Sequence, residues 1–202
     1  MAGEKKNTDT AKPERGFAEG QHVILRPVGE NDLRELARLM AECPLLDKQL
    51  PWTYQRLKKQ FEDEKDPGLW KERDKYFVVV RREGGLAGFL HEREDWNRGM
   101  YWNSVHLDDR IEDRDVLGRD IIAAYLAYKQ RWHNPLRISF DVLGPEEAKA
   151  RWLIAAGFEL ELKLERMVMY LGQAEAICTY TWLSDGLKQA MKEGEGDESP
   201  QA

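Results

Sequence analysis

The middle of the chain carries the pattern that most restricts its fold: a strand, a helix and a second strand in direct succession. An alternating run at 100–107 is followed by a helical apolar stripe over 117–132 and by a further apolar run at 136–143. Two strands of one sheet that are joined through a helix lie parallel, because the helix returns the chain to the edge where the first strand began. The sequence therefore predicts a parallel pair of strands inside a sheet.

Hairpin signals lie on both sides of this unit. Two apolar runs at 75–82 and 86–93 are separated by Glu83-Gly84-Gly85, which is typical of a tight turn between antiparallel strands. The run at 158–165 alternates strictly, so it predicts a half-buried strand. We expect the buried face of that strand to consist of Phe158, Leu160, Leu162 and Leu164.

The predicted fold class is α/β, in the α+β sense. It is a mixed, mostly antiparallel, seven-stranded sheet with the central parallel unit and with helices on both faces. The remaining strands are predicted at 22–27 and 174–183, and the remaining helices at 32–42, 53–65 and 145–156.

Composition separates one domain from two polar ends. Residues 1–20 and 186–202 contain too few apolar groups to order themselves, so we expect flexible tails around a domain at 21–185. The net charge of −6 argues mildly against nucleic acid and is compatible with an amine-bearing substrate. Two distant cysteines, no membrane-length apolar run and no signal peptide predict a cytoplasmic protein without a membrane partner.

Five stretches resemble one known family at its own spacing. They are HVILRPVGENDLRELARLM, YFVVVRREGGLAGFL, VLGRDII, RISFDVLGPEEAKARWLIAAGFELE and LERMVMYLGQAEAICTYTWLSDG. In this order they resemble the GNAT superfamily of N-acetyltransferases, and within it the branch that acetylates the N-termini of ribosomal proteins. The resemblance covers residues 21–185 and implies acetyl-CoA as the acyl donor and a peptide N-terminus or small-molecule amine as the acceptor. The sequence leaves open whether the chain forms a homodimer.

In that family a glycine-rich turn before a helix binds the pyrophosphate of coenzyme A through backbone N–H groups and the positive end of the helix dipole. Gly118 matches the second glycine, whereas Val116 replaces the first and Asp113 replaces a Gln or Arg. We expect the amides from Val116 to Arg119 to gather around the ligand. The acetyl-CoA site implied by the resemblance comprises Val105, Leu107, Arg114, Val116, Leu117, Gly118, Arg119, Glu146 and Trp152.

Catalytic groups are less well marked. Alternation places His106 on one face of its strand with Trp102 and Ser104, near the expected thioester, where it could act as a base through a water molecule. Glu92 and Glu94 are rival bases. The family's usual tyrosine, which protonates the leaving thiolate, is replaced by Trp152, and an indole cannot do this. The motif HERE at 91–94 lacks the second histidine of a zinc site, so no metal is predicted.

Two functions therefore remain open. The first is an acyltransferase that moves an acetyl group from acetyl-CoA to a primary amine by direct attack. The second is a binding or regulatory module that keeps the fold without catalysis. The second gains support from Asp113, Val116, Glu146 and Trp152, which all depart from the family pattern.

Overall fold

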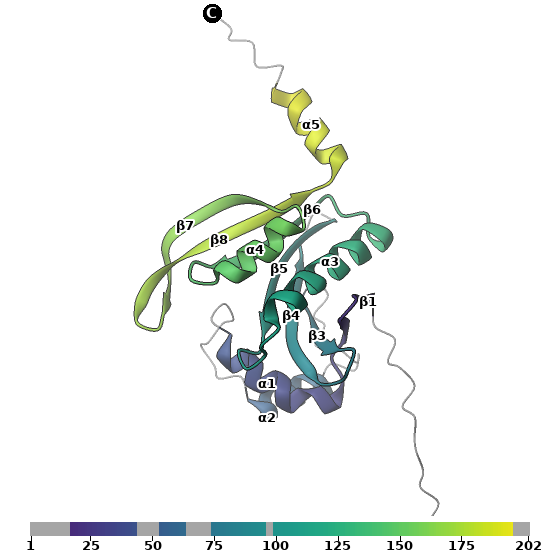
Figure 1. The fold of residues 1–202 in the computed structure, drawn as a ribbon, viewed down its shortest axis with the longest axis vertical. Helices are drawn as coiled ribbons and strands as arrows, with labels where there is room; N and C mark the ends of the chain where they lie inside the picture. Colours follow the sequence, from purple (N-terminus) through teal and green to yellow (C-terminus); the bar gives the residue numbers. More distant parts are fainter. Residues whose placement is uncertain (1–16, 44–52, 64–73, 96–98, 196–202) are drawn as a thin grey trace, which may run out of the picture.

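A computed structural model describes residues 17–43, 53–63, 74–95 and 99–195. The described residues form one eight-stranded sheet in the order β1-β2-β3-β4-β5-β6-β8-β7 (Figure 1). The mixed architecture confirms the predicted fold class, with one strand more than expected. The strands are β1 (Ala18–Glu19), β2 (Val23–Pro27), β3 (Asp74–Arg81), β4 (Leu86–Glu94), β5 (Met100–Leu107), β6 (Arg137–Leu143), β7 (Glu159–Tyr170) and β8 (Gln173–Leu183).

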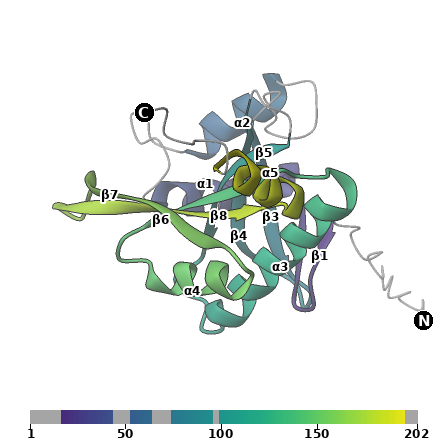
Figure 2. The ribbon, with the colours of Figure 1, turned by 90° about the horizontal axis from the view of Figure 1, so that it is seen from above.

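Helices cover both faces of the sheet. Figure 2 shows α1 (Leu33–Glu42) and α2 (Tyr54–Asp63) on one face, and α3 (Arg114–Trp132) and α4 (Glu147–Ala155) on the other. A short 3₁₀ turn, η1 (Glu30–Asp32), precedes α1, and α5 (Asp185–Glu195) ends the described chain. No helix of the described residues is both long enough and apolar enough to cross a membrane.

Alternating side chains of the strands divide the interior into two cores. On β4, Phe89 packs with Leu33, Leu36 and Met40 under α1. Its neighbour Leu90 points to the opposite face, where a larger core forms under α3 and α4. The larger core includes Tyr101, Val105, Leu107, Ile122, Tyr125, Phe140, Trp152 and Leu153. Both faces of these strands are thus buried, because successive side chains of a strand point to opposite faces of the sheet.

The predicted parallel pair lies at the centre of this arrangement. β5 and β6 are joined through α3 and pair in parallel, but their ladder runs only from Met100 opposite Arg137 to Asn103 opposite Phe140. Beyond that point β5 continues to pair with β4, and β6 continues to pair with β8. The two central strands therefore part at their carboxyl ends and leave an opening in the middle of the sheet.

The predicted buried face holds for Phe158, which packs in the core just before β7, and is wrong for the leucines of β7. Leu160, Leu162 and Leu164 are 52%, 46% and 39% exposed. The register explains part of this: Leu160 pairs with Tyr180 and Leu162 with Thr179, so Glu161 is an extra residue. A bulge of this kind shifts the alternation by one residue and places Leu160 and Leu162 on opposite faces. In Figure 1 the turn end of the β7–β8 hairpin extends beyond α4.

Ordered structure also extends past both predicted domain boundaries. Phe17 stacks on Phe77 with ring centroids 4.0 Å apart, and β1 pairs with β2. The Asp120 carboxylate of α3 accepts hydrogen bonds from the backbone N–H groups of 21, 22 and 23, which fastens this N-terminal segment to α3. At the other end, α5 falls within the predicted tail. The remainder of both tails, 1–16 and 196–202, lies outside the described residues.

Candidate active site

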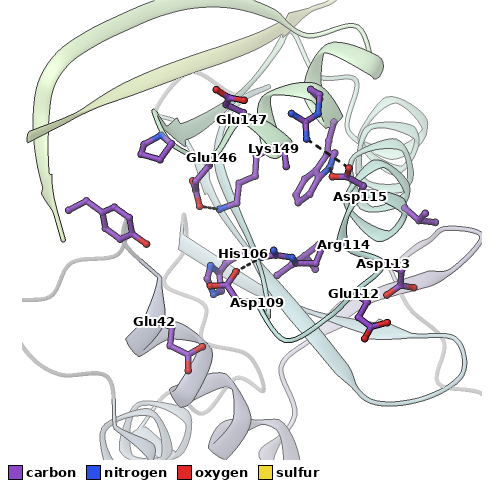
Figure 3. A pocket seen from close by; sticks show the side chains of 17 residues that line it. Glu42, His106, Asp109, Glu112, Asp113, Arg114, Asp115, Glu146, Glu147 and Lys149 are labelled. Carbon is purple, nitrogen blue, oxygen red and sulfur yellow. Dashed lines mark hydrogen bonds and ion pairs between the residues drawn. The ribbon is translucent and has the colours of Figure 1, made fainter. Parts of the chain in front are cut away.

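A cavity of about 690 Å³ lies where β5 and β6 part (Figure 3). Its volume is within the range of small-molecule sites, which is roughly 300–1,000 Å³. The lining comes from the end of α1, the end of β5, the loop at 109–113, the first turns of α3 and α4, and the β7–β8 hairpin. The residues are Glu42, His106, Leu107, Asp109, Glu112, Asp113, Arg114, Asp115, Val116, Pro145, Glu146, Glu147, Ala148, Lys149, Arg151, Trp152 and Tyr170.

Two helix N-termini open onto this cavity. The first N–H groups of a helix have no carbonyl one turn earlier to bond, and they carry the positive end of its dipole. In α3 these are the amides of Arg114 and Asp115, and in α4 they are the amides of Glu147 and Ala148. The arrangement is suited to an anion, and any anion bound there would meet donors from two helices at once.

The predicted phosphate cradle is, however, already part of α3. The helix begins at Arg114, and the amides of Val116 and Leu117 both donate to the carbonyl of Asp113 at 3.0 and 3.1 Å. The amides of Gly118 and Arg119 lie within the same helix and are therefore used by its own hydrogen bonds. The expectation that amides from Val116 to Arg119 face a ligand does not hold. Val116, which replaces a glycine of the family pattern, lies within the first turn of this helix.

Gly118 has a packing role instead. A Cβ built on Gly118 would fall well inside van der Waals distance of the Trp152 indole. The same indole donates through Nε1 to Asp115 Oδ1 at 2.8 Å. Gly118 thus lets α3 and α4 approach closely, with Trp152 buried between them. Trp152 is part of the core and also forms one wall of the cavity.

Carboxylates outnumber basic side chains around the cavity. The basic residues are Arg114, Lys149 and Arg151, and each contacts a carboxylate of the lining (Figure 3). Lys149 is buried and pairs with Glu146, whose other oxygen accepts the Leu143 N–H at 3.2 Å. Acidic residues stabilise helix N-termini, so several of these carboxylates fill the role that a bound anion would otherwise have.

An ion-pair cluster fixes the loop that forms the cavity wall. Asp108 lies 2.6 Å from both Arg38 of α1 and Arg110 of the loop. Hydrogen bonding from Arg110, with a further contribution from Arg38, holds the pKa of the Asp108 carboxyl far below its usual range. Arg38 also binds Glu42, which lines the cavity. The loop before α3 is therefore tied to α1 across the opening.

His106 is the predicted catalytic residue that reaches the cavity. Its side chain packs on Phe89, with ring centroids 5.6 Å apart, so it faces the α1 side of the sheet. Val105 and Leu107 face the other side, as alternation predicted. His106 is only 5% exposed, and its Nε2 has no hydrogen-bond partner among the residues that the structure describes. Burial, followed by the nearby Lys149 cation, lowers the pKa of His106 to about 4. The imidazole is therefore neutral at neutral pH.

Glu92 and Glu94 lie elsewhere. Glu92 is fully buried under α3, where its carboxylate accepts the Tyr125 hydroxyl at 2.6 Å and pairs with Lys129 at 2.7 Å. Burial lowers the pKa of Lys129, and Glu92 partly offsets this effect. Glu94 pairs in register with Tyr101 near the start of β5, at the opposite end from His106. Neither glutamate lines the cavity.

The structure brings together part of the predicted donor site. Leu107, Arg114, Val116, Glu146 and Trp152 line the cavity. In contrast, Val105 and Leu117 are buried in the core under α3, and Arg119 lies on the exposed surface of that helix. No group of three His, Cys, Asp or Glu residues that could hold a metal ion occurs among the described residues.

Sequence reasoning missed Lys149 and Tyr170. Lys149 follows Glu146 by three residues, a spacing that predicts an ion pair on one helical face. Tyr170 precedes the turn of the β7–β8 hairpin, so nothing in its local sequence indicates that it lines a cavity formed by α3 and α4.

Comparisons with known proteins find likeness in structure and none in sequence. No family model and no curated protein matches the sequence. The fold is similar to spermidine N-acetyltransferase from Vibrio cholerae in complex with CoA and spermine, with a TM-score of 0.68, 15% identity, and coverage of 80% of this chain and 95% of that one. A GNAT-family acetyltransferase from Bacillus anthracis gives a TM-score of 0.66 at 12% identity, with coverage of 82% and 97%.

The chain has the fold of the GNAT acetyltransferases. A third chain, carrying mutant forms of the Vibrio cholerae enzyme, agrees, with a TM-score of 0.68 at 16% identity and coverage of 84% and 98%. In this chain the opening lies between the parted strands β5 and β6. The start of α3 and the β7–β8 hairpin lie beside it.

The packing of Gly118 against Trp152 yields a stability prediction. The substitution Gly118→Ala should lower the free energy of unfolding by about 1–3 kcal/mol, because the new methyl group meets the indole. In a Trp152→Leu background the same substitution should cost at least about 1 kcal/mol less. Urea denaturation of the four proteins measures this coupling. Equal costs in both backgrounds would show that Gly118 serves something other than this contact.

The buried His106 yields a pH prediction. The unfolded chain takes up a proton near pH 6.5, whereas the folded chain does so only near 4, so the unfolded state binds more protons in between. The free energy of unfolding should therefore fall as the pH falls through this window, by up to about 3 kcal/mol from this residue. His106→Gln should lose that part of the slope in urea denaturation at about pH 7 and about pH 5. An unchanged slope would contradict the burial of a neutral imidazole.

Proposed function

We propose that this chain transfers an acetyl group from acetyl-CoA to a primary amine at the opening between β5 and β6. The observation that carries the proposal is the parting of these strands after Asn103 and Phe140, with a cavity at that point. Beyond the ladder, backbone N–H groups of β5 that point toward β6 have no strand to bond. Such an amide is suited to stabilising the oxyanion that forms when an amine attacks a thioester.

The donor would bind at the two helix N-termini. The free amides at the start of α3 and α4, together with Arg114, Lys149 and Arg151, are the donors that the cavity offers to phosphate groups. This differs from the family pattern, in which the glycine-rich turn supplies the amides. Binding here requires the ligand to displace carboxylates from their present partners, so a lower affinity for CoA is expected than a glycine-rich turn would give.

In the proposed reaction the amine attacks the thioester directly. The amine nitrogen gives up its proton to water or to a base and bonds to the thioester carbon, the C–S bond breaks, and the thiolate takes up a proton. His106 is neutral and lines the cavity, so we assign it the transfer of the amine proton through a water molecule; its lowered pKa makes it a weak base that passes the proton on to solvent. Trp152 cannot supply a proton, and its N–H is held by Asp115. Tyr170 is the phenol of the lining, and we assign it the protonation of the thiolate.

The acceptor is best described as a cationic amine. Carboxylates predominate in the cavity lining, and they attract protonated amines while opposing anionic acceptors. The similar Vibrio cholerae enzyme is solved with spermine, which is an amine of this kind. A peptide N-terminus, suggested by the sequence resemblance to the ribosomal-protein branch, is the other acceptor of the same chemistry.

A second function is favoured by a specific observation. The amides of Val116 and Leu117 are bonded within α3, and the cavity lining is rich in carboxylates. Both features suit a module that binds a cationic ligand in the GNAT fold without using acetyl-CoA. Acetyl transfer and simple cation binding are separated by whether acetyl-CoA binds and releases its thiol.

Acetyl-CoA binding and turnover test the proposal. At about a hundredfold excess over its dissociation constant, acetyl-CoA should add about 2.7 kcal/mol to the free energy of unfolding. The Tm should then rise by about 5–10 °C. Thiol release should follow when spermidine or a short peptide is added. Desulfo-CoA should raise the Tm without releasing thiol. No Tm change with acetyl-CoA, together with a rise with spermidine alone, would favour the non-catalytic module.

The role assigned to Tyr170 has its own test. Tyr170→Phe should lower kcat for thiol release by about tenfold to a hundredfold, because it removes the proton donor while keeping the ring. The Kd for CoA should not change, and the loss should be smaller with a thioester whose thiol is more acidic. Tyr54→Phe on α2, outside the cavity lining, is the matched control. Equal loss with both thioesters would mean that Tyr170 acts only through packing.

A further inference from the structure

Asp141 lies at the opening between the two central strands, outside the cavity already described. It is the residue of β6 directly after Phe140, which forms the last ladder pair with β5. Its neighbours Phe140 and Val142 point into the core under α3 and α4. Because side chains alternate along a strand, Asp141 points to the α1 side of the sheet, the same side as His106 of β5.

The Asp141 carboxylate is oriented but carries no counter-charge. Thr179 of β8 donates its hydroxyl to Asp141 Oδ1 at 2.8 Å. No basic side chain of the described residues lies within ion-pair distance of this carboxylate. Burial raises the pKa of Asp141, and Thr179 and the more distant Arg93 only partly oppose this. A partly buried carboxylate without a cation is costly unless a ligand supplies the missing charge.

The basic residue of β6 on the same face as Asp141 is already committed. Arg137 binds Glu161 at 2.6 Å and donates through Nε to Ser139 at 3.1 Å. Its guanidinium also lies over the Trp102 ring, 5.1 Å from the centroid. Ser139 in turn bonds Thr181 at 2.9 Å. This polar cluster does not include Asp141, which has no ion-pair partner among the described residues.

We propose that Asp141 binds a second, non-reacting ammonium group of the acceptor, with Thr179 positioning the carboxylate. The inference rests on the proposed function and deepens it: the acceptor is a diamine or polyamine rather than a monoamine. The reacting nitrogen has to be neutral in order to attack the thioester, so a carboxylate that favours a protonated amine suits the other end of the molecule. Asp141 is then a specificity residue of the acceptor site.

Calorimetric titration in the presence of CoA tests this assignment with spermidine and n-butylamine as probes. The wild type should bind spermidine at least about tenfold more tightly than n-butylamine, because the second ammonium gains a charge-assisted bond. Asp141→Asn should abolish that preference and leave the affinity for n-butylamine and for CoA unchanged. Thr179→Val should reduce the preference in part.

Glu165→Gln is the matched control, since it removes the same charge from an exposed carboxylate of β7 that pairs with Lys163. It should keep the preference for spermidine. Equal affinity of the wild type for the two amines, or a preference that survives Asp141→Asn, overturns the assignment. Thermal melts of each variant check folding. Because these titrations use CoA and no acetyl transfer, a failure of the proposed reaction would appear separately, as absent thiol release from acetyl-CoA.

Discussion

The parting of β5 and β6 is the constraint on which the rest of this structure depends. The two strands pair in parallel only as far as Asn103 and Phe140, and each then follows its outer neighbour. A sheet that loses its ladder in the middle exposes unpaired backbone groups, and these must be satisfied or used. The helix N-termini and the buried imidazole line the cavity at this opening, and the Asp141 carboxylate follows the last ladder pair of β6.

The electrostatics of the opening combine opposing features. Two helix dipoles and three basic side chains favour an anion. Carboxylates in the first turns of the same helices already interact with this positive charge. This balance differs from the glycine-rich turn that the sequence resemblance implies, where backbone amides and one helix dipole would hold the phosphate. On the side of Glu42 and Asp109 the lining carboxylates are paired with Arg38 and Arg114.

Side-chain periodicity predicted much of the fold but fewer of the residues that line the candidate site. The strand–helix–strand unit, the glycine turn at 84–85 and the face on which His106 lies are all predicted by local pattern and found in the structure. Local sequence could not place Glu92. An acidic residue on a strand gives the same sequence pattern whether its side chain faces solvent, a substrate or a buried lysine. Its partner Lys129 lies on α3, far away in sequence, and only packing brings the two together.

The sequence by itself determined the elements, their order and the presence of a parallel unit at the centre, since those depend on side-chain period and on turn chemistry between neighbours. Tertiary structure decided where α3 begins, what Gly118 accommodates, and that Tyr170 and Asp141 lie beside the opening. These features arise from contacts between residues that are distant along the chain. A bulge of one residue, such as Glu161, can reverse a face that strict alternation predicts, because the registry between strands is set by the whole sheet.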